Sequence, residues 1–283
     1  MSSHPAGRRT LRAASALTLA LGTGLALPFT LATPAGAAAA AATAAVSDNG
    51  RELSYTAAAG QKNQVTVTES YADATDITFI IDDTVPISAG NGCGHPDASD
   101  DTKVSCTVVT VDSQSPYAVL DMDLADGDDI VAIDNATDQA YYSNSVSLGA
   151  GNDRLTNTGS VDGSGVRGGP GNDTITAGVA SLVFGDAGDD TISTSGDGAE
   201  GGAGNDVLRG GAGDQILRGD DGHDTLYGGQ GDDLLYGGRG NDVLWGNSGT
   251  DQLYGNSGDD RLYGGPGQDV LSGGPGTNVV RQD

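Results

Sequence analysis

Glutamate is almost absent from this sequence, although the chain is strongly acidic. Only three of its 39 acidic residues are Glu, namely Glu52, Glu69 and Glu200, and the formal net charge is −26. A merely soluble acidic surface would mix the two acids, whereas Asp keeps its carboxylate near the backbone, where it can share a cation with carbonyls or close a turn. A chain this acidic repels nucleic acid and anionic lipid, so neither is expected as a partner.

Aromatic residues are also scarce, at 5% of the sequence. A chain with so few aromatics and so much charge of one sign would ordinarily be expected to stay disordered. Something must therefore neutralise the carboxylates before this chain can pack.

Familiar catalytic motifs are missing. The sequence contains neither HExxH nor GxSxG, and after His4 its only histidines are His95 and His223, from which a catalytic dyad is hard to build. Residues 163–168 spell GxGxxG, but no helix-forming segment follows them, which argues against a dinucleotide site. We therefore expect no enzymatic activity.

The N-terminal segment has the layout of a secretory signal peptide. Three arginines, Arg8, Arg9 and Arg12, precede an apolar run over residues 13–27 and a tract of Ala and Gly. The run is too short to span a membrane as a helix. The flanks of the paired arginines fit a twin-arginine (Tat) signal loosely, which favours the Sec route. We expect cleavage between residues 37 and 45 and a secreted, extracellular protein.

Between residues 46 and 125, apolar residues alternate with polar ones. The alternation is clearest at Val65 and Val67, at Ile77, Phe79 and Ile81, and at Val104, Cys106 and Val108. This pattern predicts short strands half buried on one face. The only cysteines, Cys93 and Cys106, are expected to form a disulfide in an exported chain. The alternative, a reactive or metal-binding pair, lacks the further Cys or His that would complete a site.

Glycine, with 47 residues, is abundant and periodic. Nine nonapeptides such as GGAGNDVLR and GGQGDDLLY follow one another over residues 201–281. All nine have Gly at the first and fourth positions and Leu or Val at the eighth, and seven of the nine have Asp at the sixth position. The six residues GGxGxD suit a tight turn, and the other three form a minimal strand with the eighth side chain facing inward. Because such strands are unstable alone, stacked units must supply both hydrogen bonds and core.

Imperfect copies of the nonapeptide occur between residues 126 and 200. The sixth-position acids are separated by 24, 20, 17 and 16 residues upstream and by 18 residues within the regular block. These intervals cluster around two nonapeptides. We infer that two units form one coil, that each upstream coil has one motif loop and one irregular loop, and that both loops are regular downstream.

The nonapeptides resemble the RTX, or hemolysin-type, calcium-binding repeat GGxGxDxUx. The resemblance is close over residues 201–281 and looser over residues 126–193. It implies an all-β fold, a right-handed parallel β-roll (β-solenoid), in which two nonapeptides make one coil and Ca²⁺ ions lie between successive loops. It also implies that the sixth-position Asp and loop carbonyls hold the ion, in keeping with the oxygen ligands that Ca²⁺ prefers.

Carried onto this sequence, the resemblance implies several Ca²⁺ ions along two columns of Asp. The expected metal ligands of the first column are Asp153, Asp173, Asp190, Asp206, Asp224, Asp242 and Asp260, with Asp129 as its upstream continuation. Those of the second column are Asp233, Asp251 and Asp269. Gln215 and Asn278 replace Asp, so an ion there should be weaker or missing. Like charges about 5 Å apart resist folding unless an ion intervenes, so metal binding should supply folding energy.

Second-position Gly is replaced in three units, by Asp220, Asn247 and Asn256. Asp and Asn tolerate the left-handed backbone region best among non-Gly residues, so the turn should survive. The last unit ends in Val279 to Arg281, which is expected to leave an open edge strand.

Four segments are therefore predicted. They are a signal peptide with an Ala-rich tract (1–45), an N-terminal β-rich cap (46–125), irregular β-roll coils (126–200) and a regular RTX β-roll (201–283). The expected function is that of a secreted calcium-binding protein that folds on binding Ca²⁺ and has a structural or adhesive role without catalysis. A cell-surface glycan or protein is the expected kind of further partner.

Two alternatives stay open. The ninth positions form two aromatic rows, Tyr227-Trp245-Tyr263 and Tyr236-Tyr254, which could bind a cell-surface glycan, although such rows are equally expected from stacking between neighbouring strands. The roll could instead be the folding module of a hydrolase. That alternative is weaker, because only residues 46–125 separate the signal segment from the first motif.

Overall fold

The structure of this chain is a computed structural model. It describes residues 40–73, 76–110, 117–137, 142–158, 164–179 and 181–282. The region of the predicted signal peptide up to residue 39 lies outside the described residues. The described part consists of strands and turns without a helix, so it contains no helix able to span a membrane.

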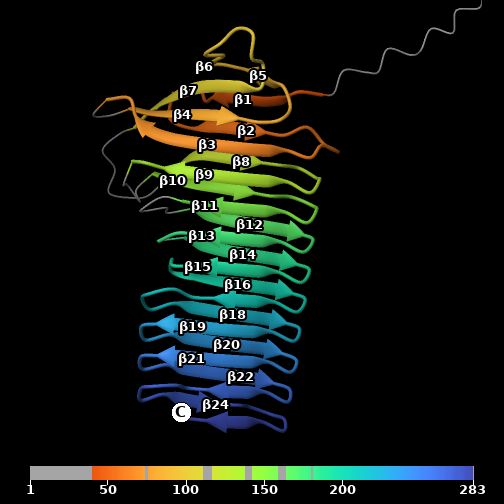
Figure 1. Ribbon diagram of the computed structural model, residues 1–283, viewed down its shortest axis with the longest axis vertical. Coiled ribbons are helices and arrows are strands. Elements are labelled where there is room, and N and C mark those ends of the chain that lie inside the picture. Colours follow the sequence, from red (N-terminus) through yellow and green to blue (C-terminus); the bar gives the residue numbers. More distant parts are fainter. Residues whose placement is uncertain are drawn as a thin grey trace, which may run out of the picture. The chain divides into compact units, whose positions relative to one another are not determined.

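Strands alternate between two sheets, so that the chain winds in stacked coils (Figure 1). One sheet has the order β24 (Val270–Ser272), β22 (Gln252–Ser257), β20 (Leu234–Arg239), β18 (Ile216–Asp221), β16 (Gly198–Ala203), β14 (Leu182–Ala187), β12 (Gly165–Pro170), β10 (Tyr142–Ser147), β8 (Tyr117–Asp123), β2 (Leu53–Thr56), β1 (Ala42–Val46) and β5 (Ile87–Ala89).

The other sheet contains the remaining strands. Its order is β25 (Val279–Arg281), β23 (Arg261–Tyr263), β21 (Val243–Ser248), β19 (Thr225–Gln230), β17 (Val207–Arg209), β15 (Thr191–Thr194), β13 (Thr174–Ala177), β11 (Arg154–Asn157), β9 (Ile130–Asn135), β3 (Gln64–Tyr71), β4 (Asp76–Asp82), β7 (Lys103–Val109) and β6 (Cys93–Gly94).

Neighbouring coils pair in parallel and in register, which confirms the predicted parallel β-roll. Leu217 lies opposite Leu235, and Leu235 opposite Leu253, so that residues 18 positions apart are neighbours. The eighth-position leucines from Leu208 to Leu262 have no exposed surface and form the core between the sheets. Each burial of this kind contributes roughly 1.5–3 kcal/mol.

The eighth-position prediction is wrong at the last unit. Val280 is 47% exposed, and Leu271 is only partly buried against the core. The physical reason is that β25 pairs with β23 alone among the described strands, so no further coil covers Val280. This confirms the open edge expected at Val279 to Arg281.

The cap continues both sheets of the roll. Strands β2 and β3 pair in parallel with β8 and β9, and antiparallel pairs then join β1 to β2, β3 to β4, and β4 to β7. The alternating apolar residues of β3, β4 and β7 are buried, as predicted. The predicted disulfide is confirmed, since Cys93 in β6 is bonded to Cys106 in β7. Strand β1 begins at Ala42, upstream of residue 46.

The fourth-position glycines let the backbones of adjacent coils approach closely. A Cβ atom on Gly222 would lie 1.5 Å from the carbonyl oxygen of Gly204 in the preceding coil, and its φ of +154° also suits Gly alone. Backbone atoms therefore fix the coil spacing on the turn side. A side chain at this position would push the coils apart.

The second-position substitutions lie in the left-handed region, as predicted. The φ angles of Asp220, Asn247 and Asn256 are 73°, 71° and 68°. Asp186 and Ala125 adopt the same conformation, with φ of 74° and 64°, although the sequence analysis did not single them out. All five follow the same turn geometry.

Two glycine substitutions should distinguish the stability lost through backbone strain in the turn from the stability lost through collision between adjacent coils. Gly213 occupies the fourth position of its unit with φ of +145°, but a Cβ there would meet only Gln215 Nε2, at 3.3 Å. We expect Gly213→Ala to lose about 1–3 kcal/mol through backbone strain. Gly222→Ala should lose more, because its Cβ also collides with neighbouring backbone. Denaturant unfolding in Ca²⁺ measures both, and equal losses would contradict this account.

Candidate metal-binding columns

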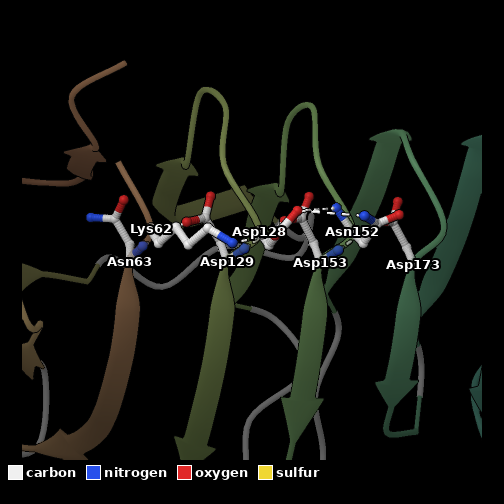
Figure 2. Close-up of polar contacts among 7 residues, drawn as sticks. All are labelled: Lys62, Asn63, Asp128, Asp129, Asn152, Asp153 and Asp173. Atoms are coloured by element: carbon white, nitrogen blue, oxygen red, sulfur yellow. Dashed lines mark hydrogen bonds and ion pairs between the residues drawn. The ribbon is translucent and has the colours of Figure 1, made fainter. Parts of the chain in front are cut away.

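The sixth-position Asp side chains of the first column form a continuous hydrogen-bonded ladder. The backbone N–H of Asp206 donates to Oδ1 of Asp224 (2.8 Å), and that of Asp224 donates to Oδ1 of Asp242 (2.9 Å). The same link runs from Asp242 to Asp260 and, upstream, joins Asp129, Asp153, Asp173, Asp190 and Asp206. Figure 2 shows the upstream end of this ladder. The uneven upstream spacing therefore leaves the turn geometry unchanged.

The second column is built in the same way on the opposite side of the roll. The backbone N–H of Gln215 donates to Oδ1 of Asp233 (2.8 Å), Asp233 donates to Asp251 (2.9 Å), and Asp251 donates to Asp269 (3.0 Å). All ten Asp residues that the sequence assigned as metal ligands thus lie in the two predicted columns. Asp129 adds an eleventh.

Ten of these carboxylates are buried with one oxygen unsatisfied. Each has at most 2% of its surface exposed. In each, Oδ2 has no hydrogen-bond donor among the described residues. The ten are Asp129, Asp153, Asp173, Asp190, Asp206, Asp224, Asp233, Asp242, Asp251 and Asp260. A buried charged oxygen without a partner is strongly destabilising, so a cation or a proton is required at each position.

Backbone oxygens converge on the same positions. A Cβ atom on Gly219 would lie 2.2 Å from Asp224 Oδ2 and 2.6 Å from the carbonyl oxygen of Gly237 in the next coil. The corresponding distances at Gly237 are 2.3 Å to Asp242 Oδ2 and 2.8 Å to the carbonyl oxygen of Gly255. First-position Gly therefore leaves open a space between a carboxylate oxygen and a carbonyl oxygen of two adjacent coils.

This donor set fits Ca²⁺, which binds hard carboxylate and carbonyl oxygens. Among the described residues, no three acidic, His or Cys side chains gather into one group. Backbone carbonyls and water would therefore have to complete each ion's shell. Soft transition metals, which favour thiolate or imidazole ligands, fit the columns poorly.

Burial controls the acidity of the columns in the absence of metal. It raises the pKa of Asp190, Asp224 and Asp233 to about 7. It raises the pKa of four others to about 6, namely Asp129, Asp173, Asp206 and Asp242. The pKa values of Asp153, Asp251 and Asp260 are raised for the same reason. The N–H donor from the preceding coil opposes this effect, whereas nearby carboxylates add to it.

The first column ends in the cap at a residue that the sequence analysis missed. Asn63 donates its backbone N–H to Oδ1 of Asp129 (2.6 Å) and its side-chain Nδ2 to Oδ2 of Asp83 (2.6 Å). The Tyr55 hydroxyl donates to the same Asp83 oxygen, and the backbone N–H of Gln64 donates to Oδ1. Both oxygens of this buried carboxylate are satisfied without a cation. No repeat motif surrounds Asn63, so only the pairing of β3 with β9 shows its place.

A second ladder, at the fifth position, was also missed. It runs in the opposite sense, since the N–H of Asn205 donates to Asp189 Oδ1 (2.7 Å) and the N–H of Asn241 donates to His223 Nδ1 (2.8 Å). Its upstream end is an ion pair between Lys62 and Asp128, visible in Figure 2. Because the position requires only a side-chain acceptor, Asp, Asn and His all serve, and no single residue type marks it in the sequence.

The two aromatic rows are aligned as predicted and are stacked. The ring centroids of Trp245 and Tyr263 are 4.0 Å apart with 13° between their planes. Those of Tyr236 and Tyr254 are 5.3 Å apart with 16°. Rings this close and nearly parallel cover one another's faces, so the stacking expected between neighbouring strands is confirmed for these pairs.

The comparison with known families agrees with this geometry. Residues 166–179, 180–198, 199–226, 210–244 and 245–280 match the model of the RTX calcium-binding nonapeptide repeat. The matched region contains the columns from Asp173 onward, whereas Asp129 and Asp153 lie upstream of it. The hydrogen-bonded ladder therefore extends beyond the matched repeats. No curated protein matches the chain.

The metal-free roll should be more stable in mild acid than at neutral pH. An unfolded Asp titrates near pH 3.9, about two to three units below most column carboxylates in the folded state. Because folding raises the pKa of these carboxylates, their protonation stabilises the folded state. This stabilisation is complete below about pH 4 and is lost as the pH rises through about 6 to 7. Far-UV circular dichroism of demetallated protein between pH 4 and 8 should show this loss, and saturating Ca²⁺ should abolish it. Greater β content at pH 8 than at pH 4.5 without metal would contradict the expectation.

Proposed function

The chain carries RTX calcium-binding nonapeptide repeats over residues 166–280, and from this premise we propose that its two Asp columns bind several Ca²⁺ ions and that the roll folds as it binds them. The observation that carries the proposal is the row of ten buried Oδ2 atoms without a donor among the described residues. Unpaired buried carboxylates at this density would prevent folding at neutral pH.

Hydrogen bonds between adjacent coils orient the column carboxylates for binding an ion. The N–H of the preceding coil holds Oδ1, as between Asp206 and Asp224, and this leaves Oδ2 directed toward the first-position Gly. A bound Ca²⁺ would supply the positive charge that this oxygen lacks. Because the carboxylate comes from one coil and the carbonyl from the next, a single coil has no complete position. Binding and coil stacking are therefore thermodynamically linked.

We further propose that the protein is secreted and has a structural or adhesive role at the cell surface. The predicted signal peptide supports export. Ala42 and Ala44 are buried in β1, where the N–H of Ala42 donates to the Pro86 carbonyl oxygen (2.9 Å). Cleavage beyond Ala42 would remove this strand's first residues, so within the expected window we place cleavage between residues 37 and 41.

The proposal assigns no catalytic step to the chain. Both histidines of the described part are engaged with backbone, since His95 Nδ1 lies 2.9 Å from the Lys103 carbonyl oxygen and His223 Nδ1 accepts from Asn241. Glycan binding on the aromatic rows has less support than a structural role for them. The stacked faces of Trp245 and Tyr263 are turned toward each other, so one face of each ring is closed to a sugar.

Removal of calcium should unfold most of the roll. At neutral pH and low salt, excess chelator is expected to abolish most of the β signal in far-UV circular dichroism, because the column carboxylates then repel one another and remain desolvated. Added Ca²⁺ should restore the signal, and isothermal titration should show binding over the same concentrations. A spectrum unchanged by excess chelator would refute the proposal.

A matched pair of substitutions tests the columns themselves. Asp224→Asn removes a carboxylate that has 1% of its surface exposed, and we expect fewer bound ions and a Ca²⁺ midpoint of folding raised on the order of tenfold. Asp221→Asn removes the same charge from an exposed pair with Arg239, an interaction worth little. Its midpoint should stay close to that of the wild type. Equal shifts in the two variants would show that only overall charge matters.

A further inference from the structure

A carboxamide side chain stands at every end of the two columns. In the first column these are Asn63 in the cap and Asn278 in the last unit, and in the second they are Gln215 and Gln282. Gln282 follows the ninth nonapeptide, at the position where each of the nine units has Gly. Like Asn63, it is therefore a column end that the repeat pattern does not reveal.

The backbone of Gln282 continues the register of the coils. The N–H of Gly265 donates to the carbonyl oxygen of Gln282 (3.1 Å), and the N–H of Gly264 donates to that of Arg281 (2.9 Å). A Cβ atom on Gly264 would lie 2.3 Å from Asp269 Oδ2 and 2.8 Å from the Gln282 carbonyl oxygen. At Gly246, one coil earlier, the corresponding distances are 2.4 Å to Asp251 Oδ2 and 2.7 Å to the Gly264 carbonyl oxygen. The same pair of oxygens thus converges at Asp269 as at Asp251.

The side chain of Gln282 makes the difference between these two positions. Its Nε2 donates to Asp269 Oδ2 (3.0 Å) and lies 3.4 Å from the Asp269 carbonyl oxygen. The equivalent Oδ2 of Asp251 has no donor among the described residues. A primary amide carries two N–H groups with partial positive charge, and these satisfy an anionic oxygen without adding net charge.

We propose that the Gln282 amide takes the place of a Ca²⁺ ion beside Asp269, so that Asp269 closes the second column without binding metal. The inference rests on the proposed calcium binding and revises the expectation that Asp269 is a metal ligand. An ion at Asp269 would have to displace the amide, because the N–H groups that contact the carboxylate repel a cation.

The other three ends are also satisfied without metal. Gln215 Oε1 accepts the N–H of Gly211 (3.1 Å), and Asn278 Nδ2 donates to the Gly274 carbonyl oxygen (2.9 Å). Asn63 donates to Asp83, as described above. Amides at the four ends therefore limit ion binding to the carboxylates between them.

Counting bound ions tests the inference directly. Native mass spectrometry of the calcium-saturated protein resolves single ions, and circular dichroism at saturating Ca²⁺ checks that each variant is folded. We expect Asp269→Asn to leave the ion count unchanged, whereas Asp251→Asn should lower it. Gln282→Ala should raise the count by one, and the double variant Gln282→Ala/Asp269→Asn should return it to the wild-type value.

Gln252→Ala serves as the matched control, because Gln252 is exposed on β22 and lies outside both columns. It should leave the count unchanged. A lower count in Asp269→Asn, or an unchanged count in folded Gln282→Ala, would overturn the inference while leaving calcium binding by the columns intact. A wild-type protein that binds no calcium would instead overturn the proposed function, and this inference with it.

Discussion

Buried like charge is the constraint on which this structure depends. Each coil places an Asp side chain directly over that of the next, with one oxygen held by a backbone N–H and the other directed into an oxygen-lined space. Leucine burial alone would favour stacking, but unneutralised carboxylates oppose it at neutral pH. Under the proposed function, the coils therefore stack stably only when bound cations or protons neutralise these carboxylates.

The glycines make this arrangement sterically possible. First-position Gly leaves room beside the Oδ2 atom of the column carboxylates from Asp173 onward, and fourth-position Gly allows backbone contact between coils, as between Gly204 and Gly222. The fifth-position ladder then ties the turns together from the other side. Turn geometry, coil spacing and carboxylate position thus depend on the same nine residues, which explains why the motif repeats as a whole.

At the ends of the roll, unlike in its middle, carboxylates are satisfied by hydrogen-bond donors of the chain itself. In the cap, an apolar core and a disulfide stabilise the sheets, and Asp83 is satisfied by Tyr55 and Asn63. At the far end, Gln282 satisfies Asp269, although Val280 stays exposed on the edge strand. Neutral amides thus lie at the boundaries between the acidic columns and the segments on either side of them.

Much of the fold follows from the sequence itself, because the same residue types recur at the same positions of successive units. The spacing of Asp129 to Asp260 predicts a coil of two nonapeptides, and alternation predicts β3, β4 and β7. The resemblance to the calcium-binding repeat implies the two columns. Two of the four column ends were decided only by the tertiary structure. Asn63 meets Asp129 across 66 residues, and Gln282 reaches Asp269 from outside the nine units. Such contacts occur once, so no repetition marks them, and only the stacking of coils brings their atoms together.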